Sequence, residues 1–187
     1  MEALLVSAGI AALAEIGDKT QLLALVLAVR FRKPIPISLG IAVATLANHA
    51  IAGMLGAWIA SLVAPDHLRW ILGASFIAMA VWVLIPDKLE QMESRPLRLG
   101  VFGTTLLCFF LVEIGDKTQV ATVALAIQYQ PLAWVVIGTT IGMLLANVPA
   151  VLLGECIAQK IPVRMMHVIA AGIFLILGIA AMIGVGT

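Results

Sequence analysis

The sequence is poor in the residue types on which soluble proteins depend. Of its 187 residues only 11% are charged and 6% aromatic, and two are cysteines. The hydrophobic fraction is 63% and the mean hydropathy is +1.13, more apolar surface than a soluble domain of this length can bury. The net charge of +1 gives no reason to expect a nucleic-acid partner. Lipid is therefore the expected solvent for this chain.

Two further absences narrow the interpretation. Cys108 and Cys156 lie in separate apolar segments and form no CxxC pair, so no disulfide framework is expected. The first apolar segment has no basic residues before it and is too long for the core of a signal peptide. We therefore expect this segment to remain in the mature protein.

The apolar residues form six long runs, which predict an all-α integral membrane protein of six transmembrane helices. Each run can cross about 30 Å of hydrocarbon at about 1.5 Å per residue, and lipid requires a backbone that bonds to itself. Most prolines fall at or between the run ends, as helix punctuation does, while Pro149 lies inside the fifth run. The runs are 3–29, 35–63, 68–86, 99–128, 131–158 and 162–185.

Basic residues are distributed unequally over the loops between the runs. The odd-numbered loops contain eight lysines and arginines, and the opposite side contains only Arg69. This bias places the odd loops in the cytoplasm and both termini outside it. The eight residues are Arg30, Arg32, Lys33, Lys88, Arg95, Arg98, Lys160 and Arg164.

An internal repeat divides the chain into two halves of a single membrane domain, 1–90 and 91–187. Residues 15–21 read Glu-Ile-Gly-Asp-Lys-Thr-Gln, and residues 113–119 repeat these letters 98 positions later. Asn48 and Asn147 correspond at an offset of 99. Three helices per half give the second half the opposite orientation, so we predict two inverted three-helix repeats.

The repeated segments place ionisable groups near the centre of the first and fourth runs. On a continuous helix, the glutamate, the aspartate three residues later and the glutamine six residues later would form one slanted stripe. Lysine would flank that stripe, glycine would permit close approach or a local break, and threonine could bond to freed carbonyls. The first copy supplies Glu15, Gly17, Asp18, Lys19, Thr20 and Gln21, and the second Glu113, Gly115, Asp116, Lys117, Thr118 and Gln119.

These groups predict a binding site for a divalent cation at the middle of the bilayer. Four carboxylates and two lysines leave two negative charges, which match one divalent cation or two protons. The expected ligands are oxygens of Glu15, Asp18, Glu113 and Asp116, followed by Gln21 and Gln119. Oxygen ligands suit Mg²⁺, Ca²⁺ or Mn²⁺, and no cysteine or histidine lies in either copy. Protons would compete with the metal for these oxygens, which favours a cation/proton antiporter.

Other polar residues in the apolar runs have less certain roles. Asn48 and Asn147 line the cavity or bond between helices, and the sequence does not separate these alternatives. We expect His49 to pack between helices and Glu155 to lie at the cytoplasmic interface. Lys19, Thr20, Lys117 and Thr118 are expected to support the site, and a purely structural alternative makes Glu15–Lys19 and Glu113–Lys117 neutral pairs within one helix.

The duplicated motif E-x-G-D-[KR]-[TS], complete at 15–20 and 113–118, resembles the Golgi manganese/calcium transporters of eukaryotes and the MneA-type manganese exporters of bacteria. The resemblance covers nearly the whole chain. It implies proton-coupled export of Mn²⁺, or of Ca²⁺ in some members, from the cytosol. The short segment between the halves looks bacterial and implies an inner membrane.

The sequence therefore predicts a secondary transporter with no enzymatic activity and no cofactor. Its partners would be a divalent metal ion, protons and the lipid bilayer. The sequence is compatible with a homo-oligomer and does not determine the oligomeric state. Two alternatives remain, an exporter of a small cationic organic solute and a passive divalent-cation channel. An intramembrane aspartyl protease is disfavoured, because Glu15 and Glu113 stand where its Gly-x-Gly-Asp motif needs glycine.

Overall fold

A computed structural model describes residues 1–85, 99–153 and 163–184, and the described part of the chain is helical with no strand. The first predicted run is two helices, α1 (Glu2–Glu15) and α2 (Lys19–Phe31). The fourth run is likewise α5 (Gly100–Glu113) and α6 (Lys117–Gln128). The other helices are α3 (Pro34–Leu62), α4 (Pro65–Trp82), α7 (Leu132–Leu153) and α9 (Val163–Met182).

Within the described residues, three helices are long and apolar enough to cross a membrane, Pro34–Leu62, Leu132–Leu153 and Arg164–Met182. Prolines stand in the first turns of α3 and α4, where the missing N–H costs nothing. Pro149 lies inside α7, which continues through it. The predicted runs 3–29 and 99–128 are each interrupted at the motif, where the sequence allows a local break at Gly17 and Gly115.

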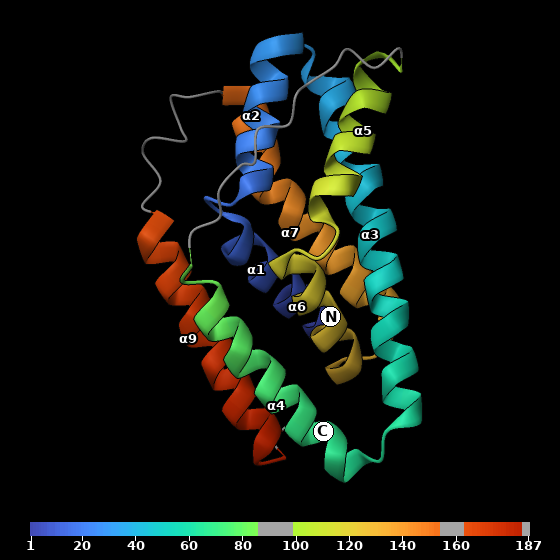
Figure 1. Cartoon of the computed structure of the whole chain (residues 1–187), viewed down its shortest axis with the longest axis vertical. Helices are drawn as coiled ribbons and strands as arrows, with labels where there is room; N and C mark the ends of the chain where they lie inside the picture. The colour runs from blue at the N-terminus through green and yellow to red at the C-terminus, as the bar shows by residue number, and fades with distance from the viewer. Residues whose placement is uncertain (86–98, 154–162, 185–187) are drawn as a thin grey trace.

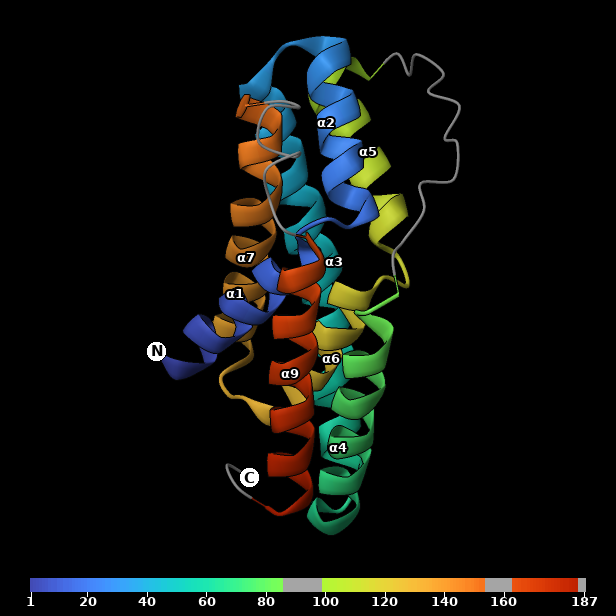
Figure 2. The same cartoon turned by 90° about the vertical axis from the view of Figure 1, so that its left-hand side faces the viewer.

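The helices of the two halves pack against each other in matching pairs. α1 packs on α7 as α5 packs on α3, and α2 packs on α7 as α6 packs on α3 (Figure 1). α4 and α9, the last helix of each half, lie side by side in both views (Figure 2). Each half therefore completes its packing with the helices of the other half.

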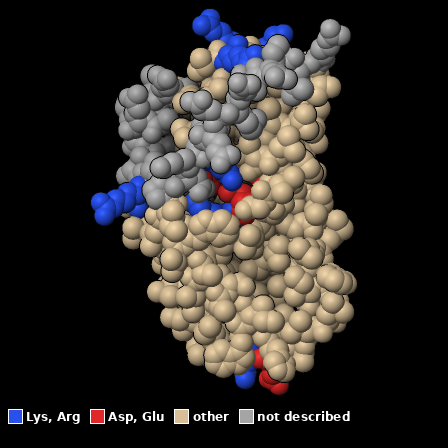
Figure 3. All heavy atoms as spheres, in the orientation of Figure 1, with Lys and Arg blue, Asp and Glu red and all other residues tan. Residues whose placement is uncertain are grey.

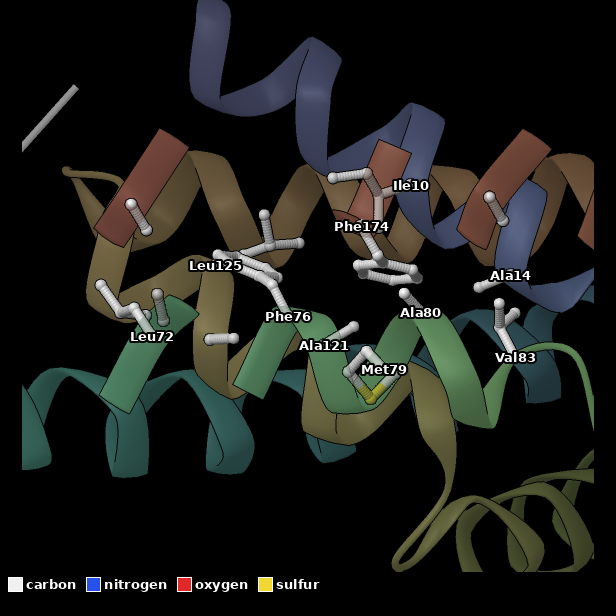
Figure 4. Packing of buried hydrophobic residues seen from close by; sticks show 14 of the residues in the cluster. Ile10, Ala14, Leu72, Phe76, Met79, Ala80, Val83, Ala121, Leu125 and Phe174 are labelled. Carbon is white, nitrogen blue, oxygen red and sulfur yellow. The ribbon is translucent and has the colours of Figure 1, made fainter. Parts of the chain in front are cut away.

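The α4–α9 pair is not placed symmetrically along the molecule. α9 contacts α1 and α4 contacts α6, whereas this pair makes no extensive contact with α2 or α5 among the described residues. Aromatic and aliphatic side chains fill the contacted side, where the Phe76 and Phe174 ring centroids are 6.2 Å apart (Figure 4). In the described part of the chain, the α4–α9 pair therefore packs against α1 and α6 rather than against α2 and α5.

Candidate cation-binding site

Both copies of the motif interrupt their helix with the same tight turn. Ile16 (φ −62°, ψ 118°) precedes Gly17 (φ +84°), and the Asp18 N–H donates to Glu15 O at 3.0 Å. Ile114 (φ −63°, ψ 120°) precedes Gly115 (φ +76°), with a matching 3.1 Å bond from Asp116 to Glu113. These angles and bonds are those of a type II β-turn, whose third position favours glycine. The glycine in each motif is therefore required by backbone conformation.

The motif glutamines stabilise these breaks. Gln21 Oε1 accepts the Gly17 N–H at 2.9 Å, and Gln119 Oε1 accepts the Gly115 N–H at 2.7 Å. Gln21 Nε2 also donates to Ala146 O on α7 at 2.9 Å. Satisfying these backbone groups internally is what a break surrounded by lipid requires. The expected stripe along one continuous helix is wrong, and metal ligation by either glutamine stays a prediction.

Three of the four motif carboxylates gather in one cluster. Ligand oxygens of Glu15, Asp18 and Asp116 all lie within 4.8 Å of one another, and the three residues are buried. Asp18 and Asp116 are the N-caps of α2 and α6, so the positive ends of both helices meet the cluster. Figure 3 shows acidic and basic atoms together at mid-height, apart from the other charged atoms, which lie at the top, left edge and bottom of this face. We name Glu15, Asp18 and Asp116 the carboxylate cluster.

The fourth carboxylate, Glu113, is held by helix α3 of the other half. Its Oε2 accepts hydrogen bonds from Asn48 Nδ2 at 3.2 Å and Thr45 Oγ1 at 3.4 Å. His49 Nε2 lies 3.0 Å from Glu113 Oε1, within ion-pair distance but without the alignment of a hydrogen bond. Glu113 and His49 are both fully buried. The structure thus brings Glu113 to a polar contact on α3 and leaves it out of the carboxylate cluster.

Asn147 contacts Glu15 in the way that Asn48 contacts Glu113. Its Nδ2 donates to Glu15 Oε1 at 3.1 Å and to Met143 O at 3.0 Å. Each asparagine therefore crosses to the motif glutamate of the other half. Glu15 is fully buried, and its Oε2 has no hydrogen-bond partner in the described part of the chain. Glu113 thus has several polar neighbours on α3, whereas Glu15 has a carboxylate oxygen without a hydrogen bond beside Asp18 and Asp116.

The two motif lysines differ in their positions. Lys19 Nζ lies 3.1 Å from Asp116 Oδ1, an ion pair that joins the halves. Lys117 Nζ donates to Ile85 O, just beyond α4, at 2.8 Å. A pair between Glu15 and Lys19 within one helix does not form, because the turn separates the two residues.

The motif threonines also differ. Thr118 Oγ1 donates to Asp116 Oδ2 at 3.5 Å, rather than to a freed carbonyl. Thr20 Oγ1, two residues after Asp18, is buried and has no hydrogen-bond partner among the described residues. The expected role of threonine at freed carbonyls is therefore not seen at Thr118.

Thr45 and His167 are not predicted from the sequence, and His49 is predicted to pack between helices without a named partner. Thr45 and His49 contact Glu113, and His167 Nε2 lies 2.9 Å from Ile16 O at the first break. Comparing the halves at an offset of 99 would have pointed to two of them, because Leu144 and Val148 stand opposite Thr45 and His49. Glu155, expected at the interface, lies outside the described residues.

An all-helical chain with apolar spans, broken helices and buried carboxylates defines a membrane transporter of ions rather than an enzyme. Over residues 3–91 and 101–186 its sequence matches the family described as Divalent cation/proton antiporter GDT1. The chain belongs to this family.

Similar proteins occur in bacteria and plants. A Vibrio cholerae protein named "Putative manganese exporter" is 54% identical over 181 residues, covering 96% of this chain and 90% of that protein. GDT1-like protein 5 of Arabidopsis thaliana is 25% identical over 210 residues, covering 91% of each. No solved structure matches.

Proposed function

We propose that this protein exports Mn²⁺ from the cytosol in exchange for protons, and that the carboxylate cluster is the shared binding site. The observation that carries the proposal is the approach of Glu15, Asp18 and Asp116 within 4.8 Å between the two halves. Carboxylates in a buried site stay ionised only with a positive partner such as a hard divalent cation, and without one they take up protons and become neutral. The resemblance to the Vibrio cholerae protein supports manganese as the cation and export as the direction.

Formal charge in the cluster suits one divalent ion. Three carboxylates and the Lys19 ammonium sum to two negative charges. Cation and protons would occupy the same oxygens in turn, so that either cargo leaves when the other binds. Glu113, three residues before Asp116, would join the ligands only in a conformation that releases it from α3.

The proposed membrane arrangement is six spans in two inverted three-helix repeats, 1–90 and 91–187. The matching pairs α1 with α7 and α5 with α3 support this symmetry. α1–α2 and α5–α6 would each cross the membrane as one broken span, with the motif at mid-depth. The charge bias of the loops supports an inner-membrane orientation with both termini outside the cytoplasm.

Alternating access would follow from movement of the α4–α9 pair. Its contacts with α1 and α6 would close one side of the cluster, and the basic residues at the α2–α3 junction, Arg30, Arg32 and Lys33, would mark the other side as cytoplasmic. The described conformation would therefore accept Mn²⁺ from the cytosol. Packing of α4 and α9 on α2 and α5 would give the opposite state.

The test is transport in liposomes that contain the purified protein. Mn²⁺ uptake is compared with Ca²⁺ and Mg²⁺ uptake, with and without a pH gradient, while an internal dye follows protons. We expect Mn²⁺ to move faster in the gradient and protons to move the opposite way. Mn²⁺ uptake that is independent of the pH gradient and is not accompanied by proton movement would make the protein a passive channel. Faster Ca²⁺ than Mn²⁺ uptake would make calcium the substrate.

A further inference from the structure

Lys19 places a positive charge of one half on a carboxylate of the other. It is the first residue of α2, and its Nζ lies 3.1 Å from Asp116 Oδ1. Asp116 belongs to the carboxylate cluster with Glu15 and Asp18. The Lys19 ammonium therefore contacts a carboxylate oxygen of the cluster that the proposed function assigns to the metal.

The two members of this ion pair differ in burial. The Lys19 side chain is 24% exposed, whereas the Asp116 side chain is 2% exposed. A lysine has four rotatable carbon bonds, so its ammonium can move away from a fixed carboxylate while the backbone stays in place. Asp116 has less freedom, because its side chain is short and buried. The lysine is thus the mobile member of the pair.

We propose that the Lys19 ammonium is a tethered cation that competes with the transported metal for Asp116, and that it promotes metal release. The proposal rests on the function proposed above. When metal binds, the ammonium leaves Asp116 Oδ1. When metal departs, the ammonium returns to Asp116 and offsets one of the three carboxylate charges. The lysine thereby lowers metal affinity and raises the turnover rate, as an exporter requires if it is to release its cargo.

The equivalent lysine provides a matched comparison. Lys117 is 1% exposed, and its Nζ is hydrogen-bonded to Ile85 O at 2.8 Å. It has the same charge and occupies the same position in the repeated motif, yet it is tied to the end of α4. The competing role is therefore assigned to Lys19 and not to both lysines.

The experiment compares Lys19→Gln, Lys19→Arg and Lys117→Gln in the purified full-length protein. Equilibrium Mn²⁺ binding is measured by calorimetry, and Mn²⁺ release by rapid mixing of loaded protein with chelator. Lys19→Gln should bind Mn²⁺ about tenfold more tightly and release it more slowly. Lys19→Arg should stay near the wild type, because it retains the charge. Lys117→Gln should not tighten binding.

A second test compares a single folded variant before and after a chemical modification. Lys19→Cys, with Cys108 and Cys156 replaced by alanine, is measured before and after alkylation with bromoethylamine, which restores an ammonium at nearly the same reach. Binding should be tighter before alkylation than after it. This comparison decides the question if Lys19→Gln does not fold.

Two sets of results separate the inference from the proposed function. Unchanged or weaker Mn²⁺ binding in folded Lys19→Gln, or equal tightening by Lys117→Gln, would overturn the tethered-cation role alone. If Asp116→Asn bound Mn²⁺ as tightly as the wild type, the cluster itself would not be the metal site. The first result can occur while the second does not, so the two failures are distinguishable.

Discussion

Glu15→Gln should make the metal-free protein more stable while removing its response to metal. The substitution keeps the size of the side chain and an oxygen for the hydrogen bond from Asn147 Nδ2. It removes one negative charge from a fully buried position beside Asp18 and Asp116. The remaining atom becomes an N–H₂ group that can donate to the neighbouring carboxylates.

The size of the stabilisation follows from the spacing of the charges. At the 4.8 Å limit of the cluster, two unit charges repel by about 3.5 kcal/mol at an effective dielectric constant of about 20. The Lys19 ammonium and bound protons offset part of this repulsion, so we expect a net gain of about 1–3 kcal/mol. For a chain of this length each kcal/mol raises Tm by about 2–4 °C.

The response to metal should change in the opposite direction. Mn²⁺ at about 100 times its Kd stabilises a protein that binds it only when folded by about 2.7 kcal/mol. Losing one of three anionic ligands should weaken binding by about 100-fold, and the same Mn²⁺ concentration would then stabilise the variant by about 0.4 kcal/mol. Metal should therefore shift the Tm of the wild type clearly and that of Glu15→Gln hardly at all.

The assay is thermal unfolding of the detergent-purified protein with and without Mn²⁺. Glu2→Gln is the control, because it makes the same chemical change at an exposed position at the start of α1. A full metal-induced Tm shift in Glu15→Gln would refute the assignment of Glu15 to the metal site. A lower Tm without metal would refute the repulsion that the cluster geometry implies.

Three further outcomes can be measured. Gly142→Ala should cost about 1–3 kcal/mol, because the added Cβ would lie 2.8 Å from Ala11 Cβ on α1, whereas Gly172→Ala meets nothing within 4 Å and should leave Tm unchanged or higher. Mn²⁺ affinity should fall as pH drops from about 8 to 5.5, since protonation removes the anionic ligands, and a flat calorimetric profile would contradict proton competition. A cysteine at the exposed Gln130 should react with an impermeant thiol reagent in intact cells, while one at Glu93 should not. The reverse pattern would show that the odd-numbered loops lie outside the cytoplasm.

Local features of the fold could be predicted from the sequence because they depend on neighbouring residues alone. The apolar runs gave the helices, and prolines gave the starts of α3 and α4. The identical segments 15–21 and 113–119 gave identical turns, since a type II turn depends on its glycine and on a nearby side chain that accepts the N–H. The possibility of a break at Gly17 and Gly115 was visible, although a continuous stripe was preferred.

Tertiary packing decided which of the equivalent side chains belong together. Glu15 and Glu113 have the same local sequence, but Glu113 contacts Thr45 and His49 on α3, whereas the corresponding positions of α7 are the apolar Leu144 and Val148. The different neighbours leave only Glu15 in the carboxylate cluster. The lysines also differ, because the end of α4 provides Ile85 O for Lys117, whereas Lys19 lies on Asp116 of the other half. An exact repeat fixes the backbone at both motifs, while the charge balance around each one depends on helices far away in the chain.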